Sequence, residues 1–205
     1  MTVVVVDYGM GNLASIMHAL DECRAQAVVS ADPASVASAE RVIVPGVGAF
    51  ADAMSNLRER GWVDVLRGAS REIPVLGICL GMQLLADRGE EGGDTEGLRL
   101  VPGRIVRLQP VSAEERIPHV GWNQVEARAE CGLFAGIAKN TDFYFVHSYH
   151  FVDAEPRDVV ATTPYCDHFV SVVARGHVVG CQFHPEKSSR AGRQFLRNFL
   201  ALAPC

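Results

Sequence analysis

Short apolar runs alternate with segments of helical periodicity through the first half of the chain. Val3–Val6, Arg41–Val44 and Val75–Ile78 are runs of the kind typical of strands buried on both faces of a sheet. Ala27–Ser30 predicts a weaker strand by the same criterion. Because a helical pattern separates most of these runs, the first half predicts a parallel sheet with helices on both faces.

The helical segments show apolar positions every three or four residues. Asn12 can cap the first helix, whose apolar positions are Leu13, Ile16, Met17, Leu20 and Cys23. A second helical stretch passes through Phe50, Met54 and Leu57. Leu80–Ala86 predicts the start of a third helix directly after a strand.

The second half of the chain has a different pattern of apolar and polar positions. Arg88–Gly97 is a polar, glycine-rich segment that predicts a loop. The strands predicted beyond it are Arg104–Leu108, Gln124–Glu126, Phe143–Val146, Val159–Thr163, Phe169–Ala174 and Val178–Phe183. The last two flank Gly176, which suits the first central position of a type II′ hairpin turn. A final helix is predicted from about Ser189, and we expect one α/β domain over residues 1–205, with an open, mostly parallel sheet plus an antiparallel portion.

Composition narrows the class of protein. The chain has 205 residues, 48% of them apolar and 21% charged, with a net charge of −5, as in an ordinary globular domain. A general nucleic-acid or membrane-surface binder needs the opposite sign of charge. The longest apolar-rich stretch, Ile73–Ala86, is shorter than the ~20 residues of a spanning helix. An acid at Asp7 and the lack of a basic start argue against a signal peptide, so we expect a cytoplasmic protein with no nucleic-acid or membrane partner.

The six cysteines form no CxxC pair, so neither a zinc site nor any other metal or cofactor is expected. Without a secretory signal they should be reduced, and most should be small core residues. Cys79 differs, because Gly77 and Gly81 flank it where a predicted buried strand turns into a helix. This pattern is typical of a nucleophile elbow with Cys in place of Ser, and a buried structural cysteine is the alternative. On such an elbow the helix N-terminus lowers the pKa of the thiol and offers N–H groups to an oxyanion.

A thiolate nucleophile needs a base, and the base needs a group that orients it. His184, Pro185 and Glu186 follow the last predicted strand, and on an extended segment His184 and Glu186 point the same way. Taken alone, this segment is better explained as a surface loop. The Pro45–Gly48 turn follows the predicted strand Arg41–Val44 and could aim a second oxyanion donor at the elbow, although an ordinary turn is the simpler interpretation.

Other polar positions have simpler interpretations. We expect His18, His168 and His177 to be solvated or capping residues, and His147 and His150 to belong to a packed strand end. Taken alone, the position of Trp122 is more typical of a core residue than of a binding face. A solvated loop is expected to hold the acids Glu90, Glu91, Asp94 and Glu96.

Together, GICLGMQ at 77–83 and HPE at 184–186 resemble the signature of the triad-type, class I glutamine amidotransferases. Five more segments resemble the glutaminase subunits of imidazole glycerol phosphate synthase, an enzyme of histidine biosynthesis: DYGMGNLAS at 7–15, PGVGAF at 45–50, PHVGWN at 118–123, FYFVHSY at 143–149 and HPEKS at 184–188. The resemblance covers almost the whole chain and implies the amidotransferase fold.

The resemblance also implies roles for individual residues. Cys79 would attack the side-chain amide of glutamine, His184 would carry the proton and Glu186 would orient His184. The N–H of Leu80 and the Gly46–Val47 peptide would stabilise the oxyanion. The residues that would hold the glutamine are Gly46, Gln83, Ser148 and Tyr149.

The resemblance further implies that ammonia passes to a separate synthase subunit, a (β/α)₈ barrel, within a heterodimer. Asn12, Trp122 and Lys187 are the expected contacts with that subunit, although a merely solvated Lys187 is the simpler interpretation of a lysine. Two other classes of function stay open: a stand-alone cysteine hydrolase such as a γ-glutamyl peptidase, and a non-catalytic protein that kept the fold.

Overall fold

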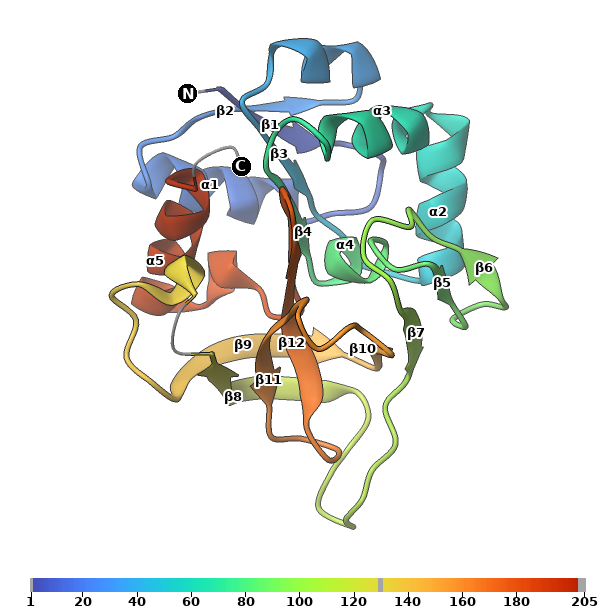
Figure 1. The fold of residues 1–205 in the computed structure, drawn as a ribbon, viewed down its shortest axis with the longest axis vertical. Coiled ribbons are helices and arrows are strands. Elements are labelled where there is room, and N and C mark those ends of the chain that lie inside the picture. Colours follow the sequence, from blue (N-terminus) through green and yellow to red (C-terminus); the bar gives the residue numbers. More distant parts are fainter. Residues whose placement is uncertain (1, 129–130, 203–205) are drawn as a thin grey trace.

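The computed structural model describes residues 2–128 and 131–202. Cys205, the last of the six cysteines, lies outside the described residues. Among these residues the strands form one sheet in the order β2-β1-β3-β4-β13-β12-β10-β7-β5-β6. Strand β11 pairs with β12 and β8, and β9 pairs with β8. Figure 1 shows helices on both sides of one end of this sheet and mostly strands and loops at the other.

Five neighbouring strands form the parallel end of the sheet. They are β2 (Gln26–Ser30), β1 (Thr2–Val6), β3 (Arg41–Val44), β4 (Val75–Ile78) and β13 (Val178–Cys181). Each pairs in parallel with the next in that order. The continuous apolar runs predicted these strands correctly, because all of them except the edge strand β2 are buried.

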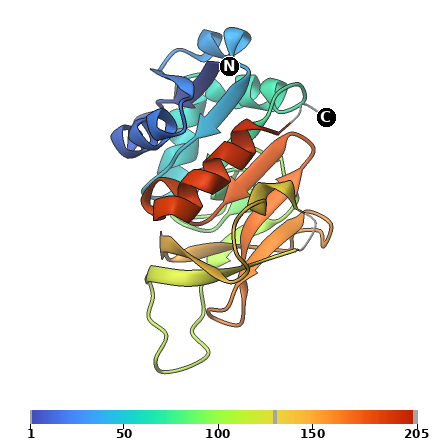
Figure 2. The ribbon, with the colours of Figure 1, turned by 90° about the vertical axis from the view of Figure 1, so that its left-hand side faces the viewer.

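Helices cover both faces of this end. Helices α1 (Leu13–Glu22) and α5 (Ser189–Leu200) lie on one face, with α2 (Phe50–Glu59) and α3 (Trp62–Ala69) on the other (Figures 1 and 2). Alternate residues of β1 enter two different cores: Val3 and Val5 pack in the core of α1 and α5, Val4 and Val6 in that of α2 and α3. The prediction of an α/β sheet covered on both faces is therefore confirmed.

The antiparallel end begins where β12 pairs with β13. Its strands are β7 (Arg104–Arg107), β8 (His119–Ala127), β9 (Thr141–His147), β10 (Tyr149–Val152), β11 (Val159–Thr163) and β12 (Phe169–Arg175). The predicted hairpin between β12 and β13 is present, with Gly176 at φ 55° and Arg175 paired with Val178.

Several predicted elements differ in extent. Strand β8 begins at His119, five residues before the predicted start, and β10 and α3 were not predicted at all. The segment Arg88–Gly97 is a short hairpin of β5 (Arg88–Gly89) and β6 (Thr95–Glu96). Short 3₁₀ helices complete the chain: η1 (Pro33–Ser38), η2 (Gly132–Phe134) and η3 (Pro185–Lys187).

The helix predicted over Leu80–Ala86 is shorter than expected. Helix α4 covers only Leu80–Gln83, and turns follow it. The carbonyl groups of Leu84 and Ala86 accept hydrogen bonds from the backbone of residues 98 and 99 instead of extending the helix. Within the described residues, no helix is both long and apolar enough to cross a membrane.

Candidate active site

Cys79 is the first residue after β4 and the N-cap of α4, with φ 55° and ψ −111°. This conformation is costly for a residue with a side chain, and it persists only where the surroundings enforce it. The chain here is packed too closely for larger residues: a Cβ on Gly81 would lie 1.9 Å from the Val44 carbonyl oxygen, and one on Gly77 would lie 2.5 Å from the Gly81 oxygen. The predicted sharp elbow is therefore present.

The Pro45–Gly48 turn lies directly beside the elbow, because β3 and β4 are neighbours. The buried hydroxyl of Tyr8 donates to the Pro45 carbonyl oxygen at 2.8 Å. A Cβ on Gly46 would come within 2.8 Å of the Leu80 side chain, the Tyr8 hydroxyl and the Gly81 nitrogen. The turn is thus held against the start of α4, and burial raises the pKa of Tyr8, which keeps its hydroxyl a donor.

His184 follows β13, the neighbour of β4, and its Nδ1 lies 2.8 Å from Oε1 of Glu186. Both side chains are almost completely buried. The expected extended geometry is wrong: His184 itself is extended, but Pro185–Lys187 forms the 3₁₀ helix η3. This 3₁₀ turn, rather than strand alternation, brings the carboxylate to the imidazole. The Ser188 hydroxyl stabilises the turn by donating to the His184 carbonyl oxygen at 2.6 Å.

Burial alone would lower the pKa of His184, but the Cys79 sulfur and the Glu186 carboxylate outweigh it and raise the pKa to about 10. Nε2 of His184 is buried and has no hydrogen-bond partner among the described residues. Sγ of Cys79 lies 3.8 Å from the Val146 carbonyl oxygen and 3.7 Å from Nε2 of Gln182. One imidazole nitrogen thus bonds the carboxylate, and the other lies beside Cys79, whose sulfur favours the protonated ring.

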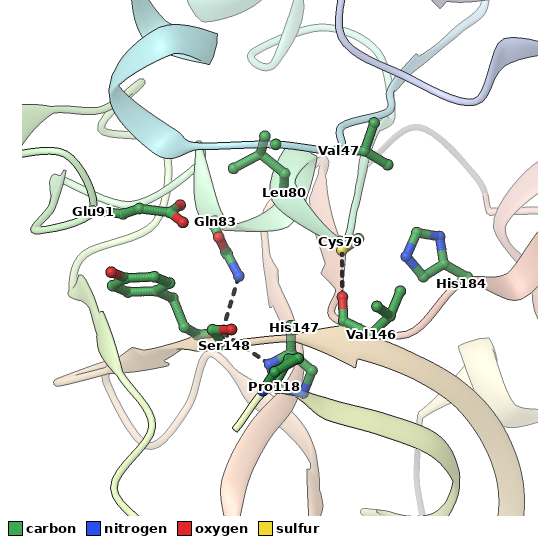
Figure 3. A pocket seen from close by; sticks show the side chains of 12 residues that line it. Val47, Cys79, Leu80, Gln83, Glu91, Pro118, Val146, His147, Ser148 and His184 are labelled. Atoms are coloured by element: carbon green, nitrogen blue, oxygen red, sulfur yellow. Dashed lines mark hydrogen bonds between the residues drawn. The ribbon is translucent and has the colours of Figure 1, made fainter. Parts of the chain in front are cut away.

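Cys79 and His184 line one cavity of about 280 Å³, close to the lower end of the ~300–1,000 Å³ typical of small-molecule sites (Figure 3). Its walls include most of the residues that the sequence singled out: Val47, Leu80, Gln83, Ser148 and Tyr149. Nε2 of Gln83 donates to the Tyr149 carbonyl oxygen at 3.0 Å. Gly46 does not line this cavity; it lies in a narrow crevice behind it.

Glu91 also lines the cavity, which corrects the expectation that it belongs to a solvated loop. Its Oε2 accepts a hydrogen bond from the Phe50 N–H at 2.9 Å and so caps α2. Burial raises the pKa of Glu91, against the lowering effect of that hydrogen bond. No sequence motif marks Glu91 as a site residue. It reaches the cavity only because the β5–β6 hairpin folds back over α2.

Of the three expected partner contacts, two lie close together around Tyr144. The rings of Trp122 and Tyr144 are 6.0 Å apart, and Nζ of Lys187 lies 5.9 Å from the Tyr144 ring centre. Trp122 is 52% exposed, so the expectation of a core tryptophan is wrong: its side chain points away from the sheet's packed face. Asn12 lies on the crevice that also borders Val47 and Glu186.

The remaining candidates divide between surface and interior. His18 and His168 are exposed, as expected, and His177 is half-buried. His147 is buried against the cavity rather than merely packed at a strand end. Residues 2–128 and 131–202 contain no cluster of His, Cys, Asp or Glu that could hold a metal ion.

Comparison with known proteins gives one family. Residues 4–203 match the family model described as "Glutamine amidotransferase class-I". The chain is 50% identical to "Imidazole glycerol phosphate synthase subunit HisH" of Moorella thermoacetica, over 96% of this chain and 93% of that protein. It is 47% identical to the protein of the same name in Methylococcus capsulatus, over 99% of this chain and 97% of that protein.

Solved structures with low identity share the fold. One described as a glutamine amidotransferase superposes with a TM-score of 0.72 at 21% identity, covering 96% of each chain. The structure of PurLQS from Thermotoga maritima superposes with a TM-score of 0.71 at 18% identity, covering 97% of each chain. At such identities the likeness concerns the architecture alone.

Proposed function

Since the chain belongs to the class-I glutamine amidotransferases, and among them to the HisH subunits of imidazole glycerol phosphate synthase, we propose that it releases ammonia from glutamine for that synthase in histidine biosynthesis. The observation that carries the proposal is that a backbone-strained Cys79 shares a cavity with a buried His184–Glu186 pair. A nucleophile, a base and an orienting carboxylate are the groups that amide hydrolysis through an acyl-enzyme requires.

In the proposed reaction, Nε2 of His184 takes the thiol proton of Cys79, and the sulfur attacks the side-chain amide carbon of glutamine. The tetrahedral oxyanion lies near the Leu80 N–H and the Gly46–Val47 peptide, whose turn is held by Tyr8. His184 then returns the proton to the leaving nitrogen, ammonia departs and a γ-glutamyl thioester remains. Water, deprotonated by His184, releases glutamate and restores the thiol.

The cavity offers groups of suitable charge for the amino-acid end of glutamine. The Glu91 carboxylate faces the cavity (Figure 3) and suits the α-ammonium group, and Ser148 and Tyr149 line the same cavity. Gln83 bonds the Tyr149 carbonyl and borders the same space. We therefore assign glutamine binding to Gln83, Glu91, Ser148 and Tyr149, and give Gly46 a packing role behind the oxyanion turn.

The synthase partner is proposed to be a separate (β/α)₈-barrel subunit that joins this chain as a heterodimer. An apolar surface beside the cavity supports this: Trp122 and Val120 on β8 are 52% and 57% exposed, and Val146 on β9, paired with Val120, is 36% exposed. Lys187 adds a positive charge at its edge. A cytoplasmic site of action is supported by five free cysteines among the described residues.

The test is to measure glutamate release by this chain alone, with the barrel subunit, and with the barrel subunit plus its nucleotide ligand. We expect a low rate of glutamate release by the chain alone and a higher rate after each addition. The partner would favour the conformation of the Pro45–Gly48 turn that binds the oxyanion, and it would close the cavity. Three similar rates would favour the stand-alone hydrolase. No release in any mixture, together with no labelling of Cys79 by a glutamine-like electrophile, would favour a non-catalytic protein.

A further inference from the structure

Two buried histidines beside the cavity have no part in the proposed reaction. His147 ends β9 and lines the cavity, and His119 begins β8 directly opposite it in the strand pairing. Their exposed fractions are only 6% and 4%. A buried imidazole nitrogen without a hydrogen-bond partner destabilises the fold, so each ring nitrogen of the two histidines is expected to have a partner.

The contacts around the two rings permit one arrangement of protons. Nδ1 of His147 lies 2.9 Å from the Tyr149 carbonyl oxygen, which can only accept, so this nitrogen carries a proton. Nε2 of His147 is then an acceptor, and Nδ1 of His119, 3.0 Å away, must donate to it. Nε2 of His119 is left to accept from Nδ2 of Asn123 at 3.4 Å.

The surroundings keep this arrangement fixed. Burial lowers the pKa of His119 to about 4 and that of His147 to about 3, so both rings are neutral at neutral pH. The orientation of the Asn123 amide follows from its oxygen, which accepts from the Gln124 N–H at 2.8 Å. The His119 ring stacks on Tyr165 with centroids 4.0 Å apart, and the Tyr165 hydroxyl is bonded to the Arg116 backbone as both donor and acceptor.

The chain of bonds ends at a group that borders the proposed substrate site. The Tyr149 carbonyl oxygen accepts from His147 and also from Nε2 of Gln83 at 3.0 Å. Gln83 in turn donates to Oε1 of Gln182 at 3.0 Å, and Nε2 of Gln182 lies 3.7 Å from the Cys79 sulfur. The Tyr149 carbonyl is therefore the point where the histidine pair of the antiparallel end meets the side chains around the nucleophile.

We propose that His119 is a positioning residue for the glutamine pocket: its Nδ1–H donates to Nε2 of His147 and fixes the orientation of that ring, so that the Nδ1–H of His147 holds the Ser148–Tyr149 backbone in place. The identity of the ligand rests on the proposed function. Because His119 acts through His147 on a binding surface rather than on the reacting atoms, its loss should weaken glutamine binding and leave the chemical step nearly unchanged.

The first arm of the test is nitrogen-detected NMR of the histidine rings in the full-length chain. We expect wild-type His147 to carry its proton on Nδ1 alone. In His119→Phe, which keeps a ring on Tyr165 but no donor, Nε2 of His147 loses its hydrogen bond, so the resonance of this nitrogen should move downfield while Nδ1 stays protonated. His119→Asn, whose amide nitrogen replaces Nδ1, should restore the wild-type resonance. A wild-type proton on Nε2, or an unchanged Nε2 resonance in His119→Phe, would overturn the proposal.

The second arm is steady-state glutaminase kinetics of the full chain with its synthase partner. His119→Phe should raise KM for glutamine about tenfold, the effect of one lost buried hydrogen bond, with kcat within about twofold. His119→Asn should recover most of that KM. The control is Phe169→Leu, because Phe169 packs on both histidine rings without bonding to them and its shortening should leave KM unchanged.

The two arms separate failure of this inference from failure of the proposed function. An unchanged KM in His119→Phe, with an active wild type, would overturn the positioning role. Equal KM increases in His119→Phe and Phe169→Leu would also overturn it, because a packing defect would then explain both. A wild type without glutaminase activity would refute the proposed function, while the NMR arm would still decide whether His119 holds the His147 ring.

Discussion

The two ends of the sheet contribute to the site in different ways. The parallel end supplies the proposed reactive groups, Cys79 after β4 and His184 after β13, from neighbouring buried strands. The antiparallel end supplies the opposite wall of the cavity, through His147 and the residues that follow it, and an exposed apolar surface around Trp122. The proposed nucleophile and base are thus held by a closely packed core, whereas the residues proposed to recognise substrate and partner lie in a more exposed region.

Close backbone contacts hold the elbow at the parallel end, and the first prediction concerns a substitution that disturbs one of them. Gly81→Ala would place a Cβ 1.9 Å from the Val44 carbonyl oxygen, which is backbone and cannot move aside cheaply. We expect a loss of at least about 3 kcal/mol in the free energy of unfolding. Urea unfolding measures it.

The matched control is Gly132→Ala in the antiparallel half, where a Cβ would meet nothing within 4 Å. We expect its free energy of unfolding to stay within about 0.5 kcal/mol of wild type. Equal losses in the two variants would mean that the close backbone contact at Gly81 does not stabilise the fold as described.

The second prediction separates the two members of the buried pair. His184→Ala should lower glutaminase kcat about 10³-fold, because it removes the proposed base. Glu186→Gln should lower it about 10²-fold, because the imidazole remains and loses only its 2.8 Å charged partner. Similar residual rates for the two variants, measured with the partner present, would leave Glu186 without the subordinate role.

The same contrast explains what could be predicted from the sequence. At the parallel end, runs such as Val75–Ile78 are buried on both faces, so their apolar composition and the elbow around Cys79 are visible along the chain. At the antiparallel end, β8 has mainly one packed face and includes an exposed Trp122, so its start was not predicted, and only the family resemblance placed the tryptophan on the surface. Residues such as Glu91 enter the site only through tertiary folding, which no local pattern records.

The third prediction concerns the apolar surface of the antiparallel end. Trp122→Ala should weaken binding of the synthase subunit about 30-fold, the size expected for a central aromatic contact, and leave the free energy of unfolding almost unchanged because the side chain is 52% exposed. Val111→Ala, at a 67% exposed valine in the loop between β7 and β8, should change neither. Calorimetric titration of both variants would decide; equal affinities would remove Trp122 from the interface.

The fourth prediction uses the opposite pKa shifts of the two ends. His119 and His147 have folded pKa values of about 4 and 3, below the unfolded 6.5. The unfolded chain therefore binds more protons in acid. Each of these two histidines should lower the free energy of unfolding by about 1 kcal/mol as the pH falls from 7.5 to 5.5. His184 has a folded pKa of about 10, so its contribution is present below pH 6.5 and is lost as pH rises through 10.

Urea unfolding across pH checks both directions. His119→Asn should flatten the acid side of the stability profile relative to wild type, and His184→Asn should flatten the alkaline side. An acid side that is equally steep in His119→Asn and wild type would show that the buried histidines of the antiparallel end do not resist protonation as described.

The most direct test of the account compares two nitrogen sources in the complex of this chain with its synthase partner. With Cys79→Ala, we predict that product formation from glutamine is abolished while product formation from added ammonium salt stays at the wild-type rate. Cys131→Ser, at a half-buried cysteine that does not line the cavity, should support both reactions. Glutamine-dependent product formation by Cys79→Ala at the wild-type rate would contradict the central claim that Cys79 is the nucleophile.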